Sequence, residues 1–142
     1  MKSKLKVREI SSPSEVKKLP KNYLAVLPIK ISKNTQLGKK NLSNVKSILT
    51  SIDLAVKLAK NGEVAAIVTN PINKDVIGKK VKNFKGHTEY LAKKDRTNDQ
   101  LMMMMNKNLK TIPLTTHIAI NKVSNEINKK NIIKAIINAV SY

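Results

Sequence analysis

Apolar residues recur at helical spacing in two stretches of the chain. Across Val45–Ala59 they are three or four residues apart, which places them on one face of an α-helix. Ser43 stands before this stretch in the position of an N-cap, and Asn61-Gly62 follows it as a stop signal. Near the C-terminus Asn128 is positioned to cap a second amphipathic helix, whose apolar face comprises Ile132, Ile133, Ile136, Ile137 and Val140.

Short apolar runs between these helices predict β-strands. Asn22–Ile31 is rich in β-forming residues, and Pro28 within it favours an edge strand or a strand end. Val64–Thr69 is continuously apolar up to its last residue, which is typical of a strand covered on both faces, and it ends at Asn70-Pro71. Two further strands are predicted over Leu101–Met105 and Thr111–Thr115.

Helices that alternate with apolar strands favour the α/β class, with a largely parallel or mixed sheet. Short helices are also expected around Lys74–Ile77 and over Thr88–Lys94, and Met102–Met105 is expected to be a buried strand. Residues 1–21 are polar and predict a tail or connector. The remaining residues, 22–142, would then form the α/β domain.

Composition excludes several classes of protein. A chain of 142 residues fits one domain, and 41% hydrophobic residues indicate a globular one. Because there is no cysteine, disulfides, thiolate zinc sites and cysteine nucleophiles are excluded. No apolar run approaches the roughly 20 residues of a membrane span, and the basic N-terminus lacks the apolar core of a signal peptide. We therefore expect a soluble, cytoplasmic protein with no membrane partner.

The net charge of +19 raises the question of nucleic-acid binding. Of the 28 basic residues only Arg8 and Arg96 are arginine, the residue best suited to bidentate phosphate and base recognition. Aromatic residues make up 3% of the chain, too few for a base-stacking platform, and the lysines are scattered in ones and twos. These features favour a lysine-rich solvated surface, and a small basic nucleic-acid-binding protein is kept as an alternative.

Three segments carry candidate chemistry. His87 lies within Gly86-His87-Thr88-Glu89, His117 follows Thr115-Thr116 at the end of a predicted strand, and Thr69–Lys74 leaves the end of another. Loops beyond the carboxyl ends of strands are where open α/β sheets bind ligands. Imidazoles, hydroxyls, amides and a cation suit a phosphorylated polyol and a metal, although an isolated histidine can also be purely structural. Only four glycines occur, so neither a GxGxxG fingerprint nor a Walker A loop can be built.

These segments, in this order, resemble the 4-hydroxythreonine-4-phosphate dehydrogenase family. The residues that carry the resemblance are GEVAAIVTNPINKDVI, FKGHTEYLA, MMMM and IPLTTHIAI. The family has a T-G-P-x-x-K strand end, a G-H-T-E-[FY] loop and a T-T-H strand end at similar separations. The resemblance extends over about residues 22–142 and makes this segment a partial catalytic domain with an isocitrate/isopropylmalate dehydrogenase-like sheet and flanking helices, incomplete in this chain.

The resemblance implies an NAD- or NADP-dependent oxidation in vitamin B6 biosynthesis, in which 4-hydroxy-L-threonine 4-phosphate becomes 3-amino-2-oxopropyl phosphate. It also implies a divalent metal (zinc, magnesium or cobalt) and a homodimer. By motif position, His87 and Thr88 would contact the phosphorylated substrate and His117 would be one of three histidine ligands of the metal. Lys74 would be a polar contact, and no catalytic residue is assigned.

The chain also departs from the family pattern. Asn70 stands where the motif has glycine. The chain is expected to be a fragment, inactive in isolation, because it stops before the segments that carry the other two metal histidines and the basic residues that bind phosphate. Two further alternatives are a family member that acts on a phosphorylated sugar acid such as threonate 4-phosphate, and a regulatory remnant that pairs with an intact dehydrogenase subunit.

Overall fold

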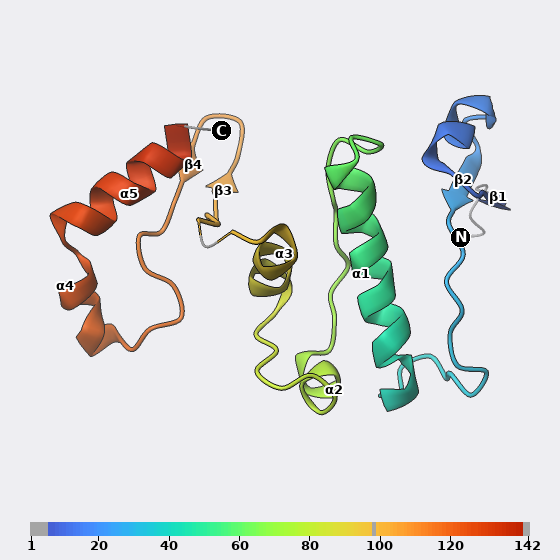
Figure 1. The fold of residues 1–142 in the computed structure, drawn as a ribbon, viewed down its shortest axis with the longest axis horizontal. Coiled ribbons are helices and arrows are strands. Elements are labelled where there is room, and N and C mark those ends of the chain that lie inside the picture. The colour runs from blue at the N-terminus through green and yellow to red at the C-terminus, as the bar shows by residue number, and fades with distance from the viewer. Residues whose placement is uncertain (1–5, 98, 141–142) are drawn as a thin grey trace. The chain divides into compact units, whose positions relative to one another are not determined.

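A computed structural model describes residues 6–97 and 99–140. The chain divides into two compact units, one up to Gly86 and one from His87 onward. Each unit has its own helices and its own pair of strands (Figure 1).

The first unit begins with two parallel strands, β1 (Lys6–Glu9) and β2 (Tyr23–Val26), in which Lys6 pairs with Tyr23 and Glu9 with Val26. A 3-10 helix, Pro13–Lys18, joins them and begins with a capping box formed by Ser12 and Glu15. Part of the segment expected to be a polar connector therefore forms regular structure. The sequence Lys-Val-Arg-Glu of β1 gives little signal because all four residues are exposed, and its pairing with β2 makes it a strand. The division into tail and domain stays a prediction.

Helix α1 (Val45–Lys60) confirms the first amphipathic pattern, and Ile52 and Val56 on it are buried. The predicted cap at Ser43 is wrong, because Ser43 lies inside a 3-10 helix, Leu42–Asn44, that precedes α1. Asn41 caps this shorter helix: its side-chain oxygen accepts a hydrogen bond from the Ser43 N–H at 2.8 Å. Helix α1 therefore begins at Val45, where the apolar periodicity begins, and a 3-10 turn precedes it.

The core of the first unit lies where α1 meets α2 (Lys74–Gly78), the short helix predicted at residues 74–77. Ile77 is fully buried and packs with Val45 and Val76. Around them pack the half-buried side chains of Ile48, Leu49, Ile72, Val81 and Phe84. Apolar side chains from α1, α2 and the loops beside α2 thus form this core without a contribution from a sheet.

The strand predicted over Val64–Thr69 is not formed in this structure. These residues run from the end of α1 to α2 without pairing to any described strand (Figure 1), and Val68 is 95% exposed. A strand gains its hydrogen bonds only from neighbouring strands, so an apolar run does not become one by its own pattern.

The second unit contains α3 (His87–Asp95), β3 (Met104–Met105), β4 (Lys110–Thr111), α4 (Val123–Glu126) and α5 (Lys129–Val140). A 3-10 helix, Ile120–Lys122, precedes α4. Strands β3 and β4 are antiparallel and shorter than the two predicted runs that contain or border them.

The cap at Asn128 is confirmed, because its side-chain oxygen accepts from the Asn131 N–H at 2.9 Å. The predicted burial of Met102–Met105 is wrong, because these four residues are 40% to 68% exposed.

The chain contains both helices and strands, consistent with the α/β class, but α1, α2 and α3 follow one another, and the described strands form two separate two-stranded sheets. One pair is parallel and the other antiparallel. Within the described residues, none of the helices has the length and apolar character needed to cross a membrane.

Replacing Ile77 with alanine tests the core. We expect I77A to lower the free energy of unfolding by about 2–5 kcal/mol, because it removes a fully buried side chain and leaves a cavity. The measurement is urea denaturation followed by the helical circular dichroism signal. In the control I31A the side chain is 63% exposed, and we expect a change within about 0.5 kcal/mol. Equal effects of the two substitutions would show that Ile77 does not form the core.

Candidate functional site

A cavity of about 160 Å³ in the second unit brings together two residues selected from separate sequence motifs. Thr88, in the first turn of α3, lies on its wall, and so does His117, which follows β4. The other lining residues are Glu89, Gln100, Leu101, Met102, Pro113, Leu114 and Thr116. The G-H-T-E and T-T-H motifs thus meet at one cavity although 28 residues separate Thr88 from His117.

His117 has a φ of 57°, in the left-handed region that non-glycine residues rarely adopt. Its side chain is exposed, and no hydrogen bond joins it to a described residue. A glycine at position 117 would form the same turn, so the turn itself does not require the imidazole. Asn83 and Arg96 also have a φ of 60°, so it is the place of His117 on the wall of the cavity that makes its side chain a candidate for function.

The cavity is polar, and among the described residues that line it the imidazole of His117 is the one basic group. Two hydroxyls, from Thr88 and Thr116, and the amide of Gln100 supply hydrogen-bond donors and acceptors. Glu89 supplies a half-buried carboxylate. No lysine or arginine is among the described residues that line it, so the cavity suits the hydroxyl and polar groups of a small molecule better than its phosphate.

His87, the first residue of α3, is half-buried and is not among the residues that line the cavity. The structure thus brings Thr88 and His117 to the same site, whereas His87 lies one residue outside it.

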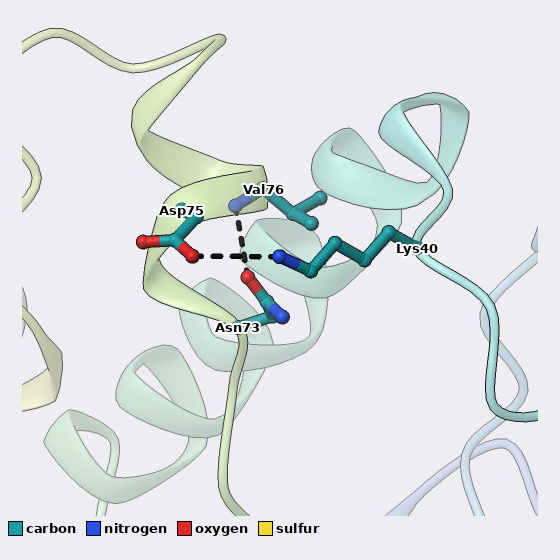
Figure 2. A network of polar contacts seen from close by, with 4 residues as sticks. All are labelled: Lys40, Asn73, Asp75 and Val76. Carbon is teal, nitrogen blue, oxygen red and sulfur yellow. Dashed lines mark hydrogen bonds and ion pairs between the residues drawn. The ribbon is translucent and has the colours of Figure 1, made fainter.

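Lys74 lies in the first unit, where it is the exposed first residue of α2. Figure 2 shows the polar contacts of the residues next to Lys74. The side-chain oxygen of Asn73 accepts a hydrogen bond from the Val76 N–H at 3.0 Å, and the carboxylate of Asp75 lies 3.4 Å from the ammonium of Lys40. Asn73 therefore caps α2, and both partners of the ion pair are exposed, so it adds little stability. The motif around Lys74 serves to begin a helix, and a substrate contact of Lys74 stays a prediction.

Sequence reasoning missed several residues that line the cavity. Gln100 belongs to no motif, Pro113 lies within IPLTTHIAI but was not selected, and the pattern of Met102 predicted burial inside a sheet. The only signal for Gln100 and Pro113 was position, since Gln100 directly precedes one predicted strand of this unit and Pro113 lies within the other. A second cavity, of about 200 Å³, shares Gln100 and Pro113 and extends to α5, where Lys134 lies 2.7 Å from Asp99.

The described residues do not form a complete metal site. No group of three or more histidine, cysteine, aspartate or glutamate side chains converges among them. His117 offers one imidazole, whereas a bound transition metal needs three or four protein ligands. The described part of this chain therefore does not fit a metal ion by itself.

Comparison with known proteins identifies a family. The family model described as pyridoxal phosphate biosynthetic protein PdxA matches residues 1–141, which includes the segment expected to be a connector. The 4-hydroxythreonine-4-phosphate dehydrogenase of Pseudoalteromonas translucida is 31% identical over 130 residues, covering 92% of this chain and 39% of the relative. That of Wigglesworthia glossinidia brevipalpis is 32% identical over 134 residues, covering 94% of this chain and 40% of the relative.

Solved structures agree with the sequence matches. The crystal structure of 4-hydroxythreonine-4-phosphate dehydrogenase from Klebsiella pneumoniae superposes with a TM-score of 0.83 at 29% identity, covering 94% of this chain and 41% of that one. The enzyme of the same name from Burkholderia phymatum gives a TM-score of 0.80 at 27% identity. The chain spans about two fifths of the length of the curated relatives named above. Over the whole matched region, residues 1–141, it belongs to the PdxA family of pyridoxal phosphate biosynthetic proteins.

Proposed function

We propose that this chain provides part of the substrate pocket of a dehydrogenase that oxidises 4-hydroxy-L-threonine 4-phosphate. The observation that carries the proposal is the single cavity lined by both Thr88 and His117, the residues that the family resemblance assigns to substrate and metal. The names of the relatives from Pseudoalteromonas and Wigglesworthia supply the substrate.

The reaction that we propose removes a hydride from the carbon that bears the secondary hydroxyl and a proton from that hydroxyl. The resulting 3-oxo acid loses carbon dioxide and gives 3-amino-2-oxopropyl phosphate. NAD or NADP, when bound, supplies the hydride acceptor. The residues of this chain orient the substrate: the hydroxyls of Thr88 and Thr116 and the amide of Gln100 are suited to hydrogen-bond its polar groups.

Other features of the proposal rest on the family resemblance. His87 contacts the substrate beside Thr88, and His117 is one ligand of a divalent metal whose other ligands lie outside the described residues. The sheet of the complete enzyme is of the isocitrate/isopropylmalate dehydrogenase type, and the enzyme is a cytoplasmic homodimer. Since the cavity lacks a lysine or arginine, the phosphate of the substrate is held outside it.

Substrate binding tests the proposal directly. We expect 4-hydroxythreonine 4-phosphate to bind the full chain in a calorimetric titration and T88A to raise the dissociation constant by roughly two- to tenfold, because one hydrogen bond is lost. H117A should weaken binding at least as much. T111A removes an exposed threonine of β4 outside the cavity and should leave the dissociation constant unchanged.

A parallel titration with threonate 4-phosphate separates the two substrate classes. Tighter binding of the sugar acid would reject the vitamin B6 assignment, whereas binding of neither ligand would reject the proposed function.

The backbone of His117 gives a second prediction, on stability. We expect H117G to unfold at a higher urea concentration than H117A, by about 1 kcal/mol in free energy, because glycine adopts a φ of 57° without a steric penalty. Both variants lack the imidazole and should show the same loss of substrate binding. A glycine variant less stable than the alanine variant would mean that residue 117 is not held in the left-handed region.

A further inference from the structure

The candidate cavity shares a wall with the second cavity of the same unit. Gln100 and Leu101 line both the candidate cavity and the cavity of about 200 Å³ that extends to α5. Whatever fixes the position of these two residues therefore also fixes one wall of the candidate site. Asp99 directly precedes them and carries contacts in two directions.

One set of contacts connects Asp99 to α5. Its carboxylate lies 2.7 Å from the ammonium of Lys134, and its carbonyl oxygen accepts a hydrogen bond from the side-chain amide of Asn138 at 3.4 Å. Lys134 and Asn138 are four residues apart and therefore lie on the same face of α5. Asn131 and Ala135, which also line the second cavity, share that face. Side chains on one face of α5 thus contact both the carboxylate and the backbone of Asp99.

A second set of contacts connects Asp99 to the end of α3. The Asp99 N–H donates to the hydroxyl of Thr97 at 3.0 Å, and the Thr97 N–H donates to the carbonyl oxygen of Ala92 at 3.1 Å. Ala92 is buried in α3, the helix that has Thr88 in its first turn. Asp99 is therefore connected on one side to the helix that contributes Thr88 to the candidate cavity, and on the other side to α5.

The ion pair between Asp99 and Lys134 acts on local position more than on overall stability. The side chain of Lys134 is 56% exposed and that of Asp99 is 58% exposed, so water screens the attraction and the pair adds little to the free energy of unfolding. The same small energy is enough to change the population of one arrangement of a short surface segment severalfold.

We propose that Asp99 is a positioning residue of the candidate site. Its contacts with Lys134 and Asn138 hold Gln100 where the amide of that side chain meets the polar groups of the substrate. Asp99 is not among the described residues that line the candidate cavity, so it acts through its neighbour. This inference rests on the proposed function, because the position of Gln100 matters only if the cavity binds a substrate.

The test is a calorimetric titration of the full chain with 4-hydroxythreonine 4-phosphate. We expect D99N and K134Q, which each remove one charge of the ion pair, to raise the dissociation constant by about two- to fivefold. K134R restores the positive charge and should recover the affinity. The matched control is K130Q, which removes an exposed lysine of the same helix that lines neither cavity and should leave the affinity unchanged.

The sign of the D99N effect separates positioning from charge. The substrate carries a negative phosphate, so charge effects alone would make K134Q weaken binding and D99N strengthen it. Weaker binding by both variants is expected only if the pair holds the wall of the cavity in place.

A mutant cycle with Gln100 separates positioning from a general loss of structure. Q100A removes the amide and should itself weaken binding. If Asp99 acts through Gln100, adding D99N to Q100A should change the dissociation constant by less than about twofold. A general loss of structure would weaken binding equally in both backgrounds.

Unchanged or tighter binding by D99N would overturn the inference and leave the proposed function standing. The same conclusion would follow if D99N weakened binding equally with and without the amide of Gln100. If the unmodified chain did not bind the substrate, the proposed function would be rejected and the positioning role of Asp99 with it.

Discussion

Packing of Ile77 against Val45 and Val76 holds the first unit together. Ile77 is the largest fully buried side chain in the described part of the protein, and it joins the start of α1 to α2. Asn44 stabilises the adjoining loop: its side chain accepts from the Ser32 N–H at 2.8 Å and donates to the Thr35 hydroxyl at 2.7 Å. The position of the Thr69–Lys74 motif depends on this small core, because Ile72 packs against it.

Hydrogen bonding distinguishes how the helices and the strands form. A helix such as α1 satisfies its backbone internally and needs only one apolar face to be covered. A strand depends on neighbours, and the described strands are only two to four residues long. The same dependence explains why Val64–Thr69 stay unpaired, whereas Met104 and Met105 pair with β4 and are nevertheless exposed.

The candidate site is built partly from local elements and partly from segments that are distant in the sequence. Thr88 lies on helix α3, and His117 lies in a turn in which its own φ is left-handed. Neither element forms a cavity by itself; the segments around residues 100–102 and 113–114 complete it. Since the residues that line it include no lysine or arginine, it accounts for the recognition of polar groups but not of a phosphate.

The sequence by itself determined helices α1, α2, α3 and α5, the family and two of the residues that line the cavity, whereas α4 was not predicted. Helical periodicity and capping residues are local, so α1, α3, α5 and the cap at Asn128 could be predicted from neighbouring residues. The motifs around Thr88 and His117 are also local strings. Only the tertiary structure decided that β1 pairs with β2, that Val64–Thr69 pairs with no described strand, and that Gln100 and Pro113 line the same cavity as His117. Strand pairing and cavity lining join residues far apart in the chain, and their sequence pattern does not specify which of them meet.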